Sequence, residues 1–591
     1  MDAVSTSALA PGAHPDDRGT TFVVLTTTAD RVEVRLFDEQ QRPIRTAALE
    51  RQDAMRFVGR LEGVTEGALY KFALDGDEVP DPYARFLPFG VHGPARALAH
   101  RREPPLASPP PLHRWSIYEL HVGTFSPEGT YRGVIDRLDA IVELGVTAIE
   151  LLPVAAFNGA RGWGYDGVAL YAPHASYGEP DDLRALVRAA HARGLAVILD
   201  AVYNHFGPSG NYLSRYAPEY FTSDVQTPWG DAPSFGWEPM RRLVLGNVSY
   251  WLDEFGFDAL RLDATHAIHD ASTPHILREV TDAVHARGRL VFFEDERNEP
   301  DVIRQLGADG VWADDFHHQV HVLVTGERDG YYAAYEPTLE ALSKNVREGW
   351  TFSGAPYGPW KGKPRGKAAK GIDRERLVTC IQNHDQVGNR ALGTRLSEHC
   401  SVDAFCAAAM LSLFVPTTPL LFMGQEWAAS TPFLFFSDHG GELGGLVSKG
   451  RREEFKSFAA FADPAVRERI PDPEARSTFE SSRLRWEERA EGEHARVLEL
   501  HKAMLRLRQD DPVLSTPSRD GDLECRVVSN GVLEVVRRSG DAERRLIVNF
   551  GEGPAPTAYS AELGEGWRVL LRSGPFDTVI PPNAALLVAV R

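Results

Sequence analysis

Residues 256–266 have the sequence GFDALRLDATH, a short apolar segment that ends in a charged cluster. The same pattern recurs at residues 289–298, RLVFFEDERN, and at residues 377–386, LVTCIQNHDQ. A carboxylate is costly to bury without a partner, so buried strands seldom end on one. We therefore expect three strands whose C-terminal ends bring their carboxylates to one shared polar site.

Around these segments, apolar strand candidates alternate with helical segments, which is typical of an α/β fold of the (β/α)8 TIM barrel type with loop insertions. The eight candidate strands span residues 116–120, 148–152, 196–200, 259–263, 290–293, 310–313, 377–381 and 420–423. Helices are expected between most of them, for example at residues 133–144, 181–193, 241–254, 274–287, 337–348 and 402–414. Catalytic residues of such barrels lie at the C-terminal ends of the strands. The stretch from Phe206 to Trp237, rich in Tyr, Pro and Gly, is predicted to be an insertion over that face.

The barrel is predicted to be the catalytic domain, at residues 113–512, between two β domains. Residues 1–98 contain short segments of β-branched, aromatic and other apolar residues and predict an N-terminal β-sandwich that is structural or docks sugars. Residues 99–112 include two runs of proline and predict a stiff linker. Residues 513–591 return to short apolar segments and predict a small C-terminal β domain.

Composition and charge limit the classes of partner. The chain has 591 residues, too many for one hydrophobic core, and its net charge of −19 argues against nucleic acid or an anionic membrane surface. The four cysteines lack CxxC spacing, so neither a disulfide framework nor a zinc site is expected. No apolar run approaches the roughly 18 residues of a membrane span, and the N-terminus lacks a secretory pattern. A cytoplasmic protein is therefore expected.

Asp263 and Glu294 have neighbours that suit two different carboxyl roles. Retaining glycosidases need one ionised carboxylate as nucleophile and a second carboxyl that is protonated at rest. Arg261 lies two residues before Asp263, on the same face of a strand, and should keep Asp263 ionised. The apolar residues 291–293 should raise the pKa of Glu294. The alternative is that Arg261 and Asp263 form a purely structural ion pair at the barrel rim.

These motifs occur in the order of the four sequence signatures of the α-amylase superfamily, and the chain resembles that superfamily over nearly its whole length. The matching segments are DAVYNH at 200–205, RLD at 261–263, Glu294, and NHD at 383–385. The resemblance implies that Asp263 is the nucleophile and Glu294 the acid/base. It implies that Asp385 is the third carboxylate, which stabilises the transition state.

The same resemblance implies which residues contact sugar. His205 and His384 would hydrogen-bond the sugar in the −1 subsite, and Tyr165 would stack beneath it. The stretch DDFHH at 314–318 is expected to belong to a polar rim loop. The other predicted substrate-binding residues lie beside the carboxylates or in the rim loops: Arg261, Leu262, Ala264, Thr265, His266, Gly326, Glu327, Arg328, Asp329, Gly330, Gln386, Val387, Gly388 and Asn389.

Within the superfamily, the motifs are most similar to those of the maltooligosyltrehalose trehalohydrolases. They are DATHAI at 263–268, EDERN at 294–298, DDFHH at 314–318, QNHDQVGN at 382–389 and FLFFSDH at 433–439. The resemblance implies hydrolysis of the α-1,4 bond that adjoins the terminal trehalose unit of a maltooligosyltrehalose. The expected ligands are maltooligosyltrehalose and related α-glucans, with no metal, no organic cofactor and no obligate protein partner. Two features depart from the family pattern, the pair Phe292-Phe293 and the Thr-rich run 26–28.

The sequence leaves two alternatives open. A 1,4-α-glucan branching or debranching enzyme belongs to the same superfamily, although a branching enzyme differs after the nucleophile and after the acid. A carbohydrate-binding homologue without activity would be expected to have lost a carboxylate, and all three are present. Product analysis with amylose and with maltotriosyl trehalose would separate branching from hydrolysis.

Overall fold

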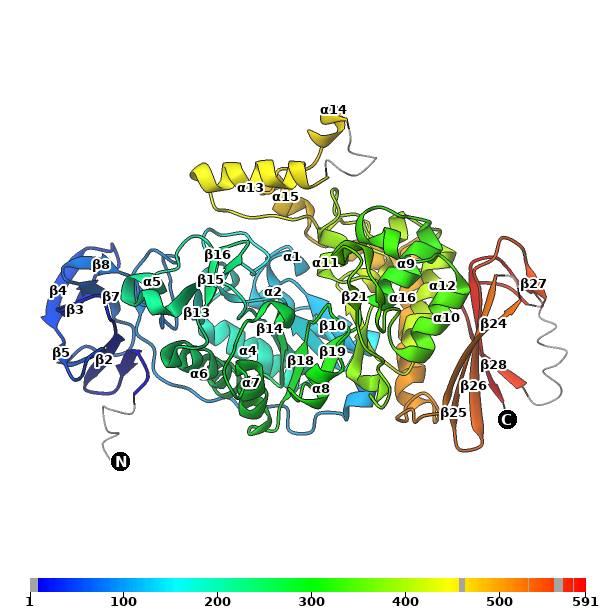
Figure 1. The fold of residues 1–591 in the computed structure, drawn as a ribbon, viewed down its shortest axis with the longest axis horizontal. Helices are drawn as coiled ribbons and strands as arrows, with labels where there is room; N and C mark the ends of the chain where they lie inside the picture. The colour runs from blue at the N-terminus through cyan, green and yellow to red at the C-terminus, as the bar shows by residue number, and fades with distance from the viewer. Residues whose placement is uncertain (1–8, 456–462, 530, 557–566, 578, 591) are drawn as a thin grey trace.

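The computed structural model describes residues 9–455, 463–529, 531–556, 567–577 and 579–590. Three parts follow one another along its long axis, with antiparallel sheets at each end and a barrel between them (Figure 1). The predicted order of a β part, an α/β barrel and a second β part is confirmed.

A closed barrel of eight parallel strands forms the centre of the molecule. The strands are β10 (Ile117–Leu120), β11 (Ala148–Leu151), β14 (Ala196–Ala201), β17 (Ala259–Leu262), β18 (Leu290–Phe293), β19 (Gly310–Trp312), β22 (Leu377–Thr379) and β23 (Thr418–Phe422). Because β23 pairs with both β22 and β10, the sheet closes on itself. All eight predicted strands are confirmed, each within two residues at either end. They are buried almost throughout, as strands with helices outside and side chains inside must be.

Helices cover the outside of the barrel. Five of them match expected segments: α4 (Pro180–His191), α6 (Glu238–Glu254), α7 (Ile276–His285), α10 (Leu339–Glu348) and α12 (Val402–Phe414). The prediction of a single helix at residues 133–144 is wrong. Two helices form there, α2 (Tyr131–Ile135) and α3 (Leu138–Leu144). Arg137 separates them: its backbone leaves helical geometry, at φ −116° and ψ 0°, and its guanidinium donates to the carbonyl of Gly133.

Two antiparallel sheets form the N-terminal part, with strand orders β1-β2-β6-β5 and β4-β3-β7-β8, and with β9 paired to β7. The strands are β1 (Gly12–Pro15), β2 (Gly19–Leu25), β3 (Val32–Phe37), β4 (Pro43–Ala48), β5 (Glu50–Arg51), β6 (Arg56–Glu62), β7 (Leu69–Leu74), β8 (Asp77–Val79) and β9 (Ala95–Arg96). Side chains from both sheets, among them Phe22, Phe57 and Phe72, pack into one apolar cluster. This packing forms the expected β-sandwich.

The Thr-rich run after β2 docks the insertion of residues 206–237 onto this sandwich. Thr26 Oγ1 donates to the carbonyl of Tyr216 at 2.7 Å, and Thr28 Oγ1 donates to the carbonyl of Arg215 at 2.7 Å. The departure from the family pattern therefore has a structural role. The elements of the insertion are α5 (Leu213–Tyr216), the 3-10 helix η4 (Pro218–Tyr220) and a hairpin of β15 (Phe221–Thr227) and β16 (Gly230–Pro233).

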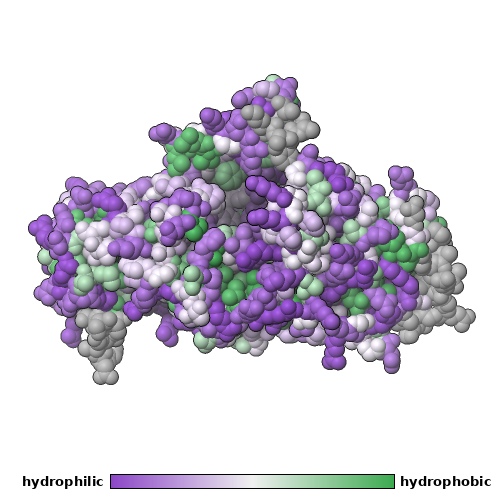
Figure 2. Space-filling view, in the orientation of Figure 1, coloured by the Kyte–Doolittle hydropathy of each residue, from purple (hydrophilic) through white to green (hydrophobic). Residues whose placement is uncertain are grey.

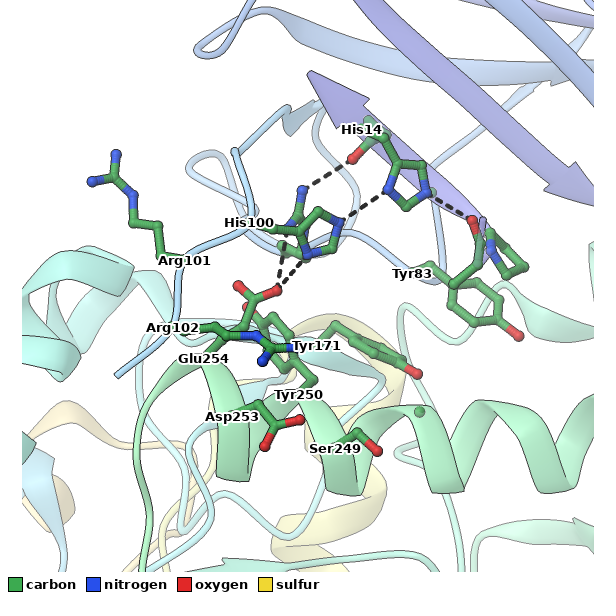
Figure 3. Close-up of a pocket in the computed structure, with 16 residues that line it drawn as sticks. His14, Tyr83, His100, Arg101, Arg102, Tyr171, Ser249, Tyr250, Asp253 and Glu254 are labelled. Atoms are coloured by element: carbon green, nitrogen blue, oxygen red, sulfur yellow. Dashed lines mark hydrogen bonds and ion pairs between the residues drawn. The ribbon is translucent and has the colours of Figure 1, made fainter. Parts of the chain in front are cut away.

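A cavity of about 320 Å³ lies at the seam between the sandwich and α6 (Figure 3). Glu254, the last residue of α6, lies 2.5 Å from His100 Nδ1 and 3.5 Å from the Arg85 guanidinium. His14, from β1, lies 3.0 Å from the other ring nitrogen of His100. These contacts join the sandwich to the barrel, and the described lining of the cavity includes none of the predicted site residues.

The C-terminal part is a five-stranded antiparallel sheet of order β24-β25-β26-β30-β28. The strands are β24 (Leu523–Ser529), β25 (Val532–Ser539), β26 (Ala542–Asn549), β28 (Trp567–Arg572) and β30 (Ala584–Val590). Helix α12 packs against α16 (Gly492–Asp510) and against β30. Arg537 reaches from the sheet to the carbonyl of Phe414, at the end of α12, at 3.0 Å. The sheet is thus attached to the barrel through α12.

An arm formed by α13 (Gly441–Glu454), α14 (Pro464–Arg467) and α15 (Arg476–Ser481) stands beside the barrel (Figure 1). Its base is held by an ion pair between Arg161 and Asp438 and by His439, which lies 3.4 Å from Asp166. Figure 2 shows a largely hydrophilic surface that is hollowed under this arm. Within the described ranges, no helix is long and apolar enough to cross a membrane, and no group of three or more His, Cys, Asp or Glu is placed to hold a metal ion.

Candidate active site

The three carboxylates singled out in the sequence lie at the C-terminal ends of three barrel strands, two of them adjacent and the third beyond β19. Asp263 follows β17, Glu294 follows β18, and Asp385 lies in α11 (His384–Gly388), after β22. The guanidinium of Arg261, in β17, contacts two of them. Its Nη1 donates to Asp263 Oδ1 at 2.8 Å, and its Nη2 lies 2.8 Å from Glu294 Oε2. The structure therefore brings these strand ends together.

The carboxylates face the open side of the site, and their partners lie beneath them. The exposed fraction of the side chain is 33% for Asp385, 18% for Glu294 and 13% for Asp263. It is 0% for Arg261 and 1% for Asp200. A substrate can reach the three carboxylates, whereas Arg261 can act only through them.

Asp263 is held in its ionised form. Burial raises the pKa of this carboxyl, but the Arg261 guanidinium and the Asn204 side chain outweigh burial and leave the pKa below its ordinary value. Asn204 Nδ2 donates to Asp263 Oδ2 at 2.7 Å. An ionised carboxylate at this position can attack an electrophilic carbon.

Glu294 has the opposite electrostatics. Burial raises its pKa well above the ordinary range, and Arg261 acts against this while the charges of Asp263 and Asp385 add to it. Glu294 Oε2 accepts the backbone N–H of Ala264 at 2.8 Å and faces Arg261, which leaves Oε1 to carry the proton. Ala264 adopts a left-handed φ of 40°, an uncommon conformation that aims its N–H at Glu294.

A buried layer beneath the carboxylates is built around Arg261. Its Nη1 donates to both oxygens of Asp200 at 2.8 Å, and its guanidinium carbon lies 4.3 Å from the centre of the Trp312 ring. Arg261 is thus shared among Asp200, Asp263 and Glu294, and is not paired with Asp263 alone.

His205 makes contacts on both ring nitrogens and on its ring face. Its Nε2 lies 2.9 Å from the carbonyl of Tyr165, its Nδ1 faces Asn204, and its ring stacks on Trp229 at 3.6 Å between centroids. Trp229, between β15 and β16, is 42% exposed and was not predicted as a site residue. The signal that could have found it is an aromatic residue in an insertion directly after His205.

His384 is deeply buried, with 1% of its side chain exposed. Its Nδ1 lies 2.6 Å from Glu119 Oε1, and its Nε2 lies 2.8 Å from the hydroxyl of Tyr165. The rings of Tyr165 and His384 stack on each other. Because protein groups already contact both ring nitrogens, the sugar contact of His384 stays a prediction. Glu119 was not predicted, although a carboxylate inside the apolar segment 117–120 was a possible signal.

Several predicted substrate-binding residues are buried beneath the three carboxylates and do not face the solvent-exposed side of the site. Leu262 and Val387 are buried, and Thr265 Oγ1 donates to the backbone carbonyl of Glu294 at 2.8 Å. Their direct contact with substrate stays a prediction, and their positions favour a supporting role. His266, at the edge of this group, has Nε2 3.7 Å from a carboxylate oxygen of Glu296.

Gly388 packs closely against Trp163, and a Cβ added there would lie 2.2 Å from two ring carbons. We expect Gly388→Ala to displace the Trp163 ring and to lower the free energy of unfolding by about 1–3 kcal/mol. Gly445→Ala, in α13, is the matched control, because no atom lies within 4 Å of its added Cβ. Thermal denaturation measures both, and an unchanged melting temperature for Gly388→Ala would contradict this packing.

The predicted rim residues 326–330 and 386–389 belong to two segments of the chain that contact each other. Glu327 accepts a hydrogen bond from Arg390 at 2.9 Å and lies 2.8 Å from His321 Nε2. Burial raises the pKa of Glu327, but these two partners outweigh burial and lower the pKa to about 2. The hydroxyl of Tyr331 donates to Gln386 Oε1 at 3.1 Å. Residues far apart in the sequence therefore build one rim surface.

The remaining residues of these segments shape the rim. Gly326 caps the end of α9 (Asp315–Thr325) in the left-handed conformation, at φ 72°, which glycine adopts without strain. Asn389 Nδ2 donates to Asp385 Oδ1 at 3.1 Å and so touches the third carboxylate. Arg328 and Asp329 lie in the link between α9 and the short helix Gly330–Ala334, and Gly330 is the first residue of that helix.

The stretch 314–318 is not a rim loop, contrary to the prediction. It starts α9 (Asp315–Thr325), whose first turns are buried. Asp315 is fully buried and accepts hydrogen bonds from Asn298 Nδ2 and from the backbone N–H of Thr351. These partners allow a carboxylate to start a helix inside the core.

Residues 90–226 match the family described as alpha amylase, catalytic domain, and residues 520–587 match a domain of unknown function. A malto-oligosyltrehalose trehalohydrolase from Deinococcus radiodurans is 47% identical over 567 residues, which cover 91% of this chain and 88% of that protein. Another, from a Rhizobium species, is 43% identical over 76% of this chain and 77% of that protein. The crystal structure of a putative alpha amylase from Salmonella typhimurium superposes with a TM-score of 0.89 at 34% identity, covering 98% of this chain and 100% of that one. With this identity, this coverage and the carboxylates at its strand ends, the chain belongs to the malto-oligosyltrehalose trehalohydrolase family of α-amylase-type glycoside hydrolases.

Proposed function

We propose that the chain is a retaining glycoside hydrolase that cleaves the α-1,4 bond adjoining the terminal trehalose unit of a maltooligosyltrehalose. The products are trehalose and a shortened maltooligosaccharide. The observation that carries the proposal is one guanidinium, that of Arg261, in contact with two carboxyl groups whose pKa values are shifted in opposite directions. Carboxyls with opposed pKa values in one site are the acid/base and nucleophile pair of such enzymes.

In this mechanism Asp263 attacks the anomeric carbon while Glu294 protonates the leaving oxygen. The glycosidic bond breaks, trehalose departs, and the remaining sugar is joined to Asp263 as a glycosyl ester. Glu294, now ionised, takes a proton from water, whose oxygen attacks the anomeric carbon; the bond from that carbon to Asp263 breaks, and the shortened maltooligosaccharide leaves with a free anomeric hydroxyl. Asp385 stabilises the positive charge that develops on the sugar in both steps.

Product analysis tests this proposal. Maltotriosyl trehalose should yield trehalose and maltotriose, and amylose should gain no α-1,6 branches. Formation of such branches would support the branching alternative. Release of glucose or maltose from maltotriosyl trehalose without trehalose would contradict the proposed specificity.

Selectivity for trehalose is proposed to lie at the rim surface built by the two loop segments. The leaving trehalose occupies the +1 and +2 subsites, where an ordinary maltooligosaccharide places an α-1,4-linked pair. We assign Gln386 and Tyr331, which hydrogen-bond each other, to these subsites because Gln386 directly follows the third carboxylate. A site that hydrogen-bonds particular hydroxyls discriminates strongly against ligands that cannot satisfy it.

Gln386→Ala should therefore lower kcat/KM on maltotriosyl trehalose roughly tenfold, the value of one lost hydrogen bond, and lower it far less on maltopentaose. Glu327→Ala should also lower kcat/KM more on maltotriosyl trehalose than on maltopentaose, because Arg390 loses the carboxylate that holds it in the rim surface. Steady-state kinetics on both substrates measures the ratio. Gln52→Ala, exposed in the N-terminal sandwich, is the control. Equal losses on both substrates would assign the rim to general glucan binding.

A further inference from the structure

A continuous set of hydrogen bonds runs beneath the site from Glu119 through His384 and Tyr165 to Asp200. Glu119 Oε1 lies 2.6 Å from His384 Nδ1, and Glu119 Oε2 accepts the backbone N–H of His384 at 2.9 Å. His384 Nε2 lies 2.8 Å from the Tyr165 hydroxyl, which lies 2.6 Å from Asp200 Oδ2. Glu119, His384 and Asp200 are at most 2% exposed, so bulk water does not compete for these bonds.

Glu119 and Asp200, the two carboxylates at the ends of this set, determine which atom donates in each hydrogen bond. Both oxygens of Asp200 accept from Arg261, and at a pH above its pKa Asp200 is an ionised acceptor with no proton to donate. The single hydroxyl proton of Tyr165 points to Asp200, so His384 Nε2 must donate to the Tyr165 oxygen. At the other end, the Glu119 carboxylate must accept from His384 Nδ1. Both ring nitrogens of His384 therefore carry a proton.

We propose that Glu119 is a positioning residue that holds His384 as an imidazolium and thereby fixes the hydroxyl of Tyr165 beneath the reacting sugar. Glu119 lies in β10 with no exposed surface, so it acts only through His384. The charge state of His384 does not depend on which glycoside is cleaved. The activity measurement below rests on the proposed function, and the spectroscopic one does not.

The charges that face His384 favour the imidazolium. Asp385 follows it in α11, with Oδ2 3.4 Å from Nε2, and Glu119 faces it from β10, whereas Arg261 opposes it from β17. Burial lowers the pKa of His384, but the two carboxylates outweigh burial and raise the pKa to about 10. The imidazolium is present below that pKa and is lost as the pH rises through it.

The other titratable neighbours add little charge near neutral pH. Burial raises the pKa of Glu150, in β11, well above its ordinary value, so this acid is neutral. Burial lowers the pKa of His121 to about 3, so this ring is neutral as well. Burial also raises the pKa of Asp200, to about 6, and at higher pH Asp200 is the ionised acceptor. The aromatic rings of Trp163 and Trp312 also contact the His384 ring, edge to face.

Loss of the Glu119 charge should let His384 titrate in the working range of pH. Its pKa would then fall toward the ordinary value of about 6.5, since Asp385 alone would oppose burial. Above that pKa one ring nitrogen loses its proton. The Tyr165 hydroxyl then loses its donor, and the ring beneath the −1 sugar loses its fixed orientation.

Glu119→Gln tests this proposal, because an amide presents one acceptor oxygen where His384 presents two donors. We expect the kcat of Glu119→Gln, divided by that of the wild type at the same pH, to be near one at pH 5 and to decline about tenfold for each pH unit above the new pKa of His384. Glu150→Gln is the matched control. Glu150 lies opposite Glu119 in the register of β10 and β11, and its carboxyl oxygens have no hydrogen-bond partner among the described residues. Its pH profile should match that of the wild type.

Nitrogen-15 NMR of the ligand-free protein separates this proposal from the proposed function. The signal of His384, assigned by comparison with His384→Gln, should be that of an imidazolium at pH 8 in the wild type and should titrate in Glu119→Gln. A neutral His384 in the wild type at pH 8 would overturn the proposal, even if the variant fails to fold. An equal loss of activity at every pH in Glu119→Gln would also overturn it.

Discussion

Asp263→Asn should lower the turnover of maltotriosyl trehalose by roughly four orders of magnitude or more. The amide keeps the size of the side chain but cannot form the glycosyl ester, so the covalent step is lost. Arg261 would keep Asp200 and Glu294 as partners, so the fold should remain. The loss should appear in kcat rather than in substrate affinity. Single-turnover kinetics with chromatographic detection of trehalose measures it directly.

Asp224→Asn, an exposed carboxylate of β15, is the control for this change and should leave turnover as it is. Thermal denaturation of both variants checks that the Asp263 variant is folded. If that variant were folded and kept one tenth of the wild-type rate, Asp263 could not be the nucleophile.

Glu294→Gln should lower turnover by about 10²–10⁴-fold, the usual contribution of general acid–base catalysis. Glu294 must be protonated for the first step, and its raised pKa keeps it protonated at higher pH, so activity should be lost as the pH rises through that pKa. Asp263 must be ionised, and its lowered pKa places the acid limb below the ordinary value of 3.8. The wild-type profile should be a bell, and Glu294→Gln should lack the basic limb.

A substrate with a phenolate leaving group sharpens the test of Glu294, because such a group departs without a proton. The formation of the glycosyl ester from an aryl α-maltoside should be impaired far less in Glu294→Gln than that from maltotriosyl trehalose. Glu340→Gln, exposed on α10, is the control. Equal impairment on both substrates, or a basic limb that persists in Glu294→Gln, would argue against Glu294 as the acid.

The barrel and its carboxylates could be predicted because their signals are local. An apolar run that ends on a charge marks a strand and its functional end within about ten residues, as at Asp263 and Glu294. Glu119 could not be found in this way. It meets His384 across 265 positions of the chain, and a local pattern carries no information on such a contact. The same holds for Trp229, whose approach to His205 depends on how the insertion folds back.

The direction of side chains along a strand explains why some predicted substrate-binding residues do not face the solvent-exposed side of the active site. Neighbouring residues of a strand point to opposite faces, so Leu262 must point away from the face that carries Arg261 and Asp263, and it is fully buried. The resemblance to the α-amylase superfamily marked the whole motif around Asp263 as substrate-binding. The alternation of side chains along the strand divides this motif into residues that face the site and residues that pack behind it. The domain limits at 1–98, 99–112, 113–512 and 513–591 stay predictions.

The docking of the insertion by Thr26 and Thr28 bears on how such a protein can change during evolution. The hairpin that carries Trp229 to His205 leaves the docked segment directly, so the sandwich braces one wall of the catalytic centre. A sandwich braced in this way is not an interchangeable module. Its loss, or its exchange for a domain from another glucan-acting enzyme, would also alter the wall that Trp229 forms, and the two parts must therefore diverge together.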